Sequence, residues 1–173
     1  MKTPDLMRRL AISFQWWRNL IVPNVYLGDR TDEMDLAIVS KSGLLWEVEV
    51  KASMADWRAD IDKRKWKCAR YDDASPARFY YAVPQEFVGK KAEATYCARS
   101  TYVFPEWLPI HAGVLLVNED RIFTARTARA LHRKPLSQKL VSELQQKLGM
   151  RYWRHVAPLL DASATAPTTM GET

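Results

Sequence analysis

One segment of the chain, residues 33–53, limits the possible folds more than any other, because its pattern is that of a β-hairpin. Residues 44–51 alternate strictly between two faces, which predicts a half-buried strand. The loop of residues 41–43 ends in glycine and suits a three-residue hairpin turn with that glycine in the left-handed conformation. One face of the second strand then carries Leu45, Glu47, Glu49 and Lys51.

This hairpin register brings two acids together. It places Asp35 of the first strand directly across from Glu49 of the second. Facing side chains in such a pair lie roughly 5 Å apart, and like charges there destabilise the sheet. A divalent cation held by oxygen ligands would offset the repulsion, with the Lys51 ammonium two residues further along the same face. A metal-bound acid pair beside a lysine is an arrangement that can hydrolyse phosphodiesters.

An acid on one strand followed by Glu-x-Lys on the next resembles the PD-(D/E)XK nuclease superfamily, which includes restriction-endonuclease-like enzymes. Three further segments are similar to its MmcB-like DNA repair branch: VKASMADWRADIDKRKW with the following Tyr71, RFYYAVP at residues 78–84, and AGVLLVNEDRIFTAR at residues 112–126. The resemblance covers roughly residues 26–156. It implies an α/β (α+β) restriction-endonuclease-like core, in which helices flank a mixed central β-sheet in the order αβββαβ.

The resemblance also implies the roles of the hairpin residues. Asp35 and Glu49 would be metal ligands and Lys51 the catalytic lysine. We expect the main-chain carbonyl of Val50 to complete the site, with Mg²⁺ as the cofactor and Mn²⁺ as a substitute. In this scheme Lys51 orients or deprotonates the attacking water and stabilises the transition state.

One feature departs from the superfamily. Many members place another Glu on the first helix. The first helix expected here, residues 4–20, has a single acidic residue, Asp5, at its start. Either the chain uses fewer ligands, or Glu47 or Glu33 takes that place. Glu47 is thus a third ligand or an acid outside the ligand set.

Charge favours a polyanionic partner, and we expect DNA. The chain of 173 residues has a net charge of +6, and its excess of Lys and Arg suits binding through counterion release. Basic residues gather after the second hairpin strand, and this cluster is expected to contact the DNA backbone. Trp66 within it either stacks on DNA or packs on a neighbouring strand. The expected DNA-binding residues are Lys63, Lys65, Trp66, Lys67 and Tyr71.

Length and patterning predict one nuclease-like domain, residues 1–158, and a disordered tail, residues 159–173, rich in Ala, Thr and Ser. No apolar run approaches the ~20 residues that span a membrane, and the N-terminus lacks the continuous apolar region of a signal peptide. Two cysteines form no disulfide framework. We therefore expect a cytoplasmic protein without a membrane partner.

Together these features predict an Mg²⁺-dependent deoxyribonuclease, an endonuclease rather than an exonuclease, acting in DNA repair, recombination or mobile-element processing. The alternative is a DNA-binding or repair-complex module on a degenerate nuclease fold, which the missing first-helix Glu favours. Because many nucleases of this type cut two strands by pairing, the resemblance also allows a homodimer.

Overall fold

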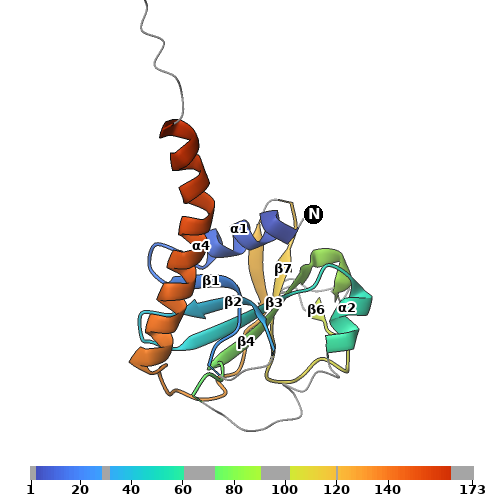
Figure 1. Ribbon diagram of the computed structural model, residues 1–173. Helices are drawn as coiled ribbons and strands as arrows, with labels where there is room; N and C mark the ends of the chain where they lie inside the picture. Colours follow the sequence, from blue (N-terminus) through green and yellow to red (C-terminus); the bar gives the residue numbers. More distant parts are fainter. Residues whose placement is uncertain (1–2, 29–31, 61–72, 91–101, 120, 165–173) are drawn as a thin grey trace, which may run out of the picture.

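The protein is an α+β fold built on a six-stranded mixed sheet with helices on both faces (Figure 1). This computed structural model describes residues 3–28, 32–60, 73–90, 102–119 and 121–164. Its elements are α1 (Thr3–Ser13), β1 (Leu20–Val25), β2 (Met34–Val39), β3 (Leu45–Val50), α2 (Met54–Ala59), β4 (Arg78–Pro84), η2 (Gln85–Phe87), β5 (Gly89–Lys90), β6 (Tyr102–Val103), β7 (Gly113–Val117), β8 (Ile122–Arg126) and α4 (Gln138–Ala164).

The strands lie in the order β1-β2-β3-β4-β7-β8. The first three pair antiparallel, β3, β4 and β7 run parallel, and β8 returns antiparallel to β7. Within the described residues, the first six elements follow the order αβββαβ, and the sheet is mixed. The predicted fold class, α+β with a mixed central sheet between helices, is therefore confirmed.

The predicted hairpin is present with the predicted turn. Ser40 and Leu44 close a three-residue loop, since the Ser40 N–H donates to the Leu44 carbonyl at 3.0 Å. Gly43 has a φ of +76°, a conformation that other residues rarely adopt. β2 and β3 pair from Val39 opposite Leu45 to Leu36 opposite Val48. The next step of this register puts Asp35 opposite Glu49, as the alternation predicted.

The two faces of the sheet pack against different helices. On one face, α1 inserts Leu6 and Leu10 over a cluster that includes Ile38 and Val48. On the other face, α4 packs Leu140 and Leu144 over Ala37, Val39 and Leu45. Further along the second face, Trp57 of α2 packs with Phe79, Tyr81 and Val83 of β4. Because side chains alternate along a strand, Glu47, Glu49 and Lys51 follow Leu45 on the face that carries α2 and α4.

The first helix is shorter than the sequence predicted. We expected it to run over residues 4–20, but α1 ends at Ser13, Gln15 adopts a φ of +56°, and residues 20–25 form β1. Trp17 follows Leu6 and Leu10 at helical spacing, which predicts that all three are buried on one face of the helix, but Trp17 is exposed. Pro23 within β1 suggested a helix end, but β1 is an edge strand and tolerates a residue without an N–H.

The last helix is longer than predicted. α4 continues to Ala164, past the expected domain boundary at residue 158, while residues 165–173 lie outside the described part of the chain. Its second half extends beyond the sheet (Figure 1). Tyr152 continues the spacing of Leu140, Leu144 and Leu148, which predicts burial, but it lies in this half and is exposed. Among the described residues, no helix is both long and apolar enough to cross a membrane.

Candidate active site

The candidate acids lie at the end of the hairpin opposite its turn. Asp35 is near the start of β2 and Glu49 near the end of β3, so the register above makes them cross-strand neighbours. Both belong to the face that carries α2 and α4. Asp35 is half-buried, whereas Glu49 has only 1% of its surface exposed. Access to the pair from solvent is thus on the Asp35 side.

Asp35 is joined directly to the strand beside it. Its Oδ2 accepts a hydrogen bond of 2.8 Å from the Val50 N–H. The Lys51 N–H points the other way and donates to the Ala82 carbonyl of β4 at 3.0 Å. In a trans peptide the carbonyl opposes the N–H that follows it, so the Val50 carbonyl points towards β2. Both main-chain groups of Val50 therefore face the Asp35 strand.

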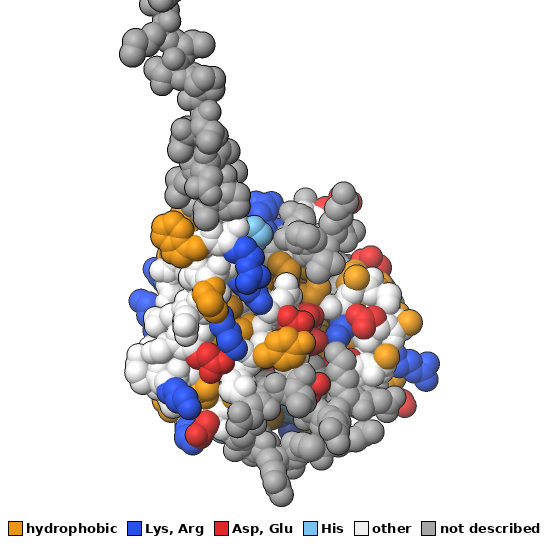
Figure 2. Space-filling model, in the orientation of Figure 1, with side chains coloured by type: hydrophobic (Ala, Val, Ile, Leu, Met, Phe, Trp, Pro, Cys, Tyr) orange, Lys and Arg blue, Asp and Glu red, His pale blue; other side chains and the backbone are white. Residues whose placement is uncertain are grey.

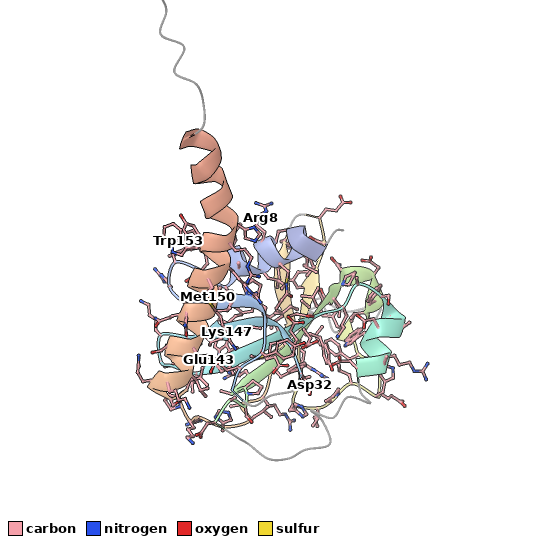
Figure 3. The ribbon with its side chains drawn as sticks, viewed as in Figure 1. Arg8, Asp32, Glu143, Lys147, Met150 and Trp153 are labelled. Carbon is pink, nitrogen blue, oxygen red and sulfur yellow. The ribbon has the colours of Figure 1, made fainter. Side chains whose placement is uncertain are left out.

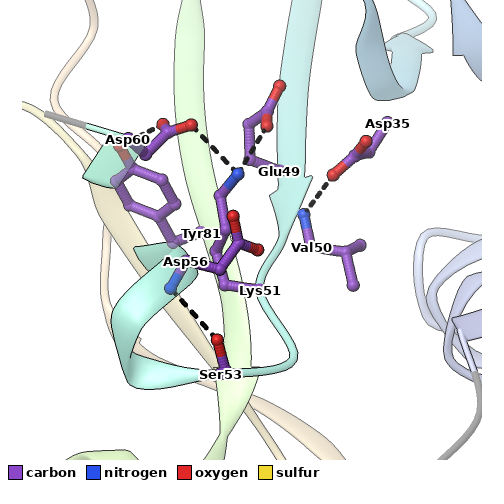
Figure 4. A network of polar contacts seen from close by, with 8 residues as sticks. All are labelled: Asp35, Glu49, Val50, Lys51, Ser53, Asp56, Asp60 and Tyr81. Carbon is purple, nitrogen blue, oxygen red and sulfur yellow. Dashed lines mark hydrogen bonds and ion pairs between the residues drawn. The ribbon is translucent and has the colours of Figure 1, made fainter. Parts of the chain in front are cut away.

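Lys51 lies between two buried carboxylates (Figure 4). Its Nζ is 3.1 Å from Glu49 Oε2 and 3.0 Å from Asp60 Oδ1. Asp60 Oδ2 in turn accepts a 2.7 Å hydrogen bond from the Tyr81 hydroxyl of β4. The side chains of Lys51, Glu49 and Asp60 are all at most 4% exposed. The lysine thus joins the hairpin acid to the helix that follows.

These contacts fix the charge of Lys51. Burial alone would lower the pKa of its ammonium, but the nearby Glu49 and Asp60 carboxylates outweigh burial and raise the pKa above its ordinary value. Lys51 is therefore a cation at neutral pH. It can stabilise negative charge and orient a ligand, but it has no lone pair with which to accept a proton. Of the two roles that we considered from the sequence, orienting a water molecule and deprotonating it, this arrangement favours the first.

Asp60 and Tyr81 are site residues that we did not single out in the sequence. Ser53 caps the start of α2, because its side chain accepts the Asp56 N–H at 3.0 Å, and a serine before a helical segment predicts such a cap. This start sets the phase of the helix and places Asp60 at its end against β4. The spacing of four residues between Asp56 and Asp60 was a signal that both acids share a helix face. The partner of Asp60 depends on tertiary packing, which that spacing does not reveal.

The donors at this site suit a hard cation such as Mg²⁺. Two carboxylates and a carbonyl supply oxygen only, and Mg²⁺ is commonly bound by one or two carboxylates with waters and substrate phosphate. A carboxylate has about four lone-pair sites, so one hydrogen bond at Asp35 or Glu49 does not by itself prevent coordination. Among the described residues, no three His, Cys, Asp or Glu side chains are grouped to hold a metal ion. Glu47, which is buried, is therefore not joined to Asp35 and Glu49 in one ligand group.

The expected DNA-binding cluster falls outside the described residues. Lys63, Lys65, Trp66, Lys67 and Tyr71 all belong to residues 61–72. Their predicted contact with DNA stays a prediction.

Comparison with known proteins bears on the fold alone. No family model and no curated protein matches the sequence. A solved structure that matches is the SPO1766 protein of unknown function from Silicibacter pomeroyi, with a TM-score of 0.60 and 20% sequence identity. The match covers 97% of this chain and 98% of that one. This protein therefore shares its fold with SPO1766 over nearly the full length of both chains.

Proposed function

We propose that this protein is a metal-dependent nuclease that hydrolyses phosphodiester bonds in DNA. One observation carries the proposal: the hairpin register sets Asp35 across from Glu49, Asp35 Oδ2 accepts the Val50 N–H at 2.8 Å, and the Lys51 ammonium lies 3.1 Å from Glu49 Oε2. The resemblance of the hairpin motif to the PD-(D/E)XK superfamily supports the same assignment. The net charge of +6 suits a polyanionic substrate.

Asp35, Glu49 and the Val50 carbonyl would hold the metal. A bound Mg²⁺ would supply Lewis-acid polarisation of the phosphoryl oxygen and lower the pKa of a water molecule. Asp35 is the more exposed of the two acids and would meet the substrate side of the site. Its hydrogen bond from Val50 fixes the carboxylate relative to the carbonyl of the same residue.

Lys51 would act through its charge. The raised pKa keeps it protonated, and a cation held by two carboxylates is fixed in place before the substrate arrives. Such a preorganised charge stabilises the negative charge that develops on a phosphoryl group in the transition state. Asp60 and Tyr81 would position the ammonium, with no contact to the reacting atoms.

A second function is favoured by a specific observation. Glu49 and Lys51 are buried and bound to each other, so in this arrangement the ion pair is closed to solvent. A nuclease-like fold that binds DNA without cutting it would keep such a pair for stability. This alternative predicts salt-sensitive DNA binding and no hydrolysis.

The two functions are separated by a cleavage assay with the purified full chain. Single-stranded, duplex, flap and junction DNA are each incubated with Mg²⁺ or Mn²⁺. Asp35→Asn and Glu49→Gln keep the shape of the side chain and an oxygen that accepts the observed hydrogen bond, but remove the charge. Glu119→Gln, an exposed acid in the β7–β8 turn, is the matched control.

The nuclease proposal expects cleavage that needs the metal, is lost by at least about 100-fold in Asp35→Asn and Glu49→Gln, and persists in Glu119→Gln. Circular dichroism would verify that the variants are folded. Cleavage that is unchanged in both site variants would remove these acids from the reaction. No cleavage of any DNA form by the wild-type chain with either metal would refute the nuclease proposal, and salt-sensitive DNA binding by the same chain would then support the binding module.

A further inference from the structure

A groove with a volume of about 250 Å³ lies between the second half of α4 and the end of β1. Its polar wall comes from α4 and its opposite wall from the chain around the β1 end and the β2 start. The lining residues used below are Tyr26, Glu33, Lys147, Met150, Arg151 and Arg154. Figure 3 shows Lys147, Met150 and Trp153 in line along one side of this helix.

The groove adjoins the candidate active site. β1 pairs with β2 from Leu20 opposite Val39 to Val25 opposite Met34, a register in which Asn24 falls across from Asp35. Arg151 donates from its two terminal nitrogens to the carbonyls of Pro23 and Asn24. The guanidinium is therefore bound to the strand position that faces Asp35. One and the same end of the sheet carries the acids and the groove.

The groove is positively charged. Lys147 Nζ lies 2.6 Å from Glu143 Oε1, so this lysine is already paired with an acid. Among the residues that line the groove, Glu33 is the acid and lies on the opposite wall. The carbonyls that Arg151 contacts carry no formal charge, so these bonds fix the guanidinium and leave its positive charge. Arg154 lies three residues further along α4, on the same side of the helix, and is exposed. Two adjacent guanidinium groups suit a phosphate, which accepts hydrogen bonds from their planar forks.

The groove also offers an aromatic surface. Tyr26 lines it and has 49% of its surface exposed, whereas Trp153, 58% exposed, lies on α4 outside the lining residues. Figure 2 shows hydrophobic and Lys or Arg side chains side by side over this part of the surface. A basic groove with exposed aromatic rings is the surface that binds single-stranded nucleic acid, because unpaired bases stack on the rings while cations hold the backbone. In a duplex the base faces are already stacked.

We propose that this groove binds a single-stranded segment of DNA, with a backbone phosphate on Arg151 and Arg154 and a base stacked on Tyr26. The proposal rests on the proposed function for the identity of the substrate and deepens it by naming the form of DNA. The bound strand would lead along α4 to the Asp35 side of the candidate active site, where that site is open to solvent.

The test measures binding without cleavage. Fluorescence anisotropy of a short labelled oligothymidylate is recorded with the full chain in the presence of a chelator, over a series of salt concentrations. A duplex of the same length serves for comparison. Arg154→Ala is the main variant because Arg154 is exposed, whereas Arg151 also holds the β1 end in place. Arg133→Ala removes the same charge from an exposed residue near the turn end of the hairpin, and is the matched control.

We expect Arg154→Ala to weaken binding of the single strand several-fold and to reduce the slope of log K against log salt by about 0.7, the value for one phosphate contact on single strands. Tyr26→Ala should weaken it by at least about fivefold, and Tyr26→Phe should retain it. Arg133→Ala should bind as the wild type does. Equal losses in Arg154→Ala and Arg133→Ala, wild-type binding by Tyr26→Ala, or tighter binding of the duplex would each overturn the proposal.

This test is separate from the cleavage assay. If the groove variants lose binding while the wild-type chain cuts no DNA, the groove assignment stands and the nuclease proposal fails. If the chain cuts DNA and the groove variants bind oligothymidylate like the wild type, the nuclease proposal stands and the groove assignment fails.

Discussion

Replacing Lys51 with methionine removes one buried charge and keeps most of the side-chain volume. The lysine ammonium contacts Glu49 Oε2 at 3.1 Å and Asp60 Oδ1 at 3.0 Å, and all three side chains are almost fully buried. In this variant the cation that compensates the negative charges of the buried Glu49 and Asp60 carboxylates is gone. The variant therefore measures how much stability depends on this one amine.

Breaking a buried ion pair by removing one partner costs about 3–5 kcal/mol, because the charge left behind stays desolvated. A domain of this kind has a total stability of about 5–15 kcal/mol. We therefore expect Lys51→Met to lose a large part of the free energy of unfolding. Lys134→Met removes a lysine whose ion pair with Asp73 is exposed, and it should change stability very little because solvent screens such pairs.

Urea unfolding followed by tryptophan fluorescence and circular dichroism would measure both variants. The loss in Lys51→Met should also depend on pH. Without the ammonium, adding a proton to the buried acid pair would relieve the repulsion between its members, so stability should recover as pH falls and the loss should grow as pH rises. A cost no greater than that of Lys134→Met, or one independent of pH between about 5 and 8, would refute the charge-compensation argument.

Three further predictions concern other parts of the fold. The pKa of Tyr81 is raised by burial and then by the Asp60 carboxylate, so the neutral hydroxyl stabilises the fold below about pH 10 and this contribution is lost at higher pH. Tyr81→Phe should therefore flatten the alkaline decrease in the free energy of unfolding. A Cβ on Gly113 would lie 2.3 Å from the Tyr80 ring, whereas one on Gly149 would contact nothing within 4 Å. Thermal unfolding should therefore show Gly113→Ala to be destabilised by about 1–3 kcal/mol and Gly149→Ala, in the α4 interior, to be stabilised by about 0.5–1 kcal/mol. The pKa of His111 is lowered by burial and then by the Arg126 charge, so the neutral imidazole stabilises the fold above about pH 6.5 and this contribution is lost as pH falls. The urea midpoint of His111→Gln should therefore decrease less than that of the wild type as the solution is acidified.

Local patterns predicted the hairpin because each of its features depends on neighbouring residues. Strict alternation fixes the two faces, and Gly43 fixes the turn, so the register that pairs Asp35 with Glu49 follows. The cap at Ser53 is equally local. These features needed no knowledge of the rest of the chain.

The errors occurred where two patterns competed or where packing decided. Residues 14–21 continue the helical spacing of α1 by position, but the branched residues of β1 pair with β2 and end the helix. Tyr152 continues the leucine spacing of α4, yet the sheet beneath it has ended. Asp60 reaches Lys51 only because α2 packs against β4, a contact between segments far apart in the sequence. Propensity and spacing describe single elements, whereas the site is assembled from four, β2, β3, α2 and β4.

The charge on Lys51 links the stability of the fold to the proposed chemistry. The two carboxylates that raise its pKa also hold the strand end and α2 together, so the residue cannot become a neutral base without weakening both contacts. With Lys51 protonated, the proposed hydrolysis would take its base from elsewhere, and the half-buried Asp35 is the more exposed of the two acids. It follows that Lys51→Arg, which keeps the charge, should preserve more activity than Lys51→Met at equal folded fraction. A pH–rate profile with no inflection from a lysine in its rising limb would agree with this role, and a rising limb that disappears in Lys51→Arg would contradict it.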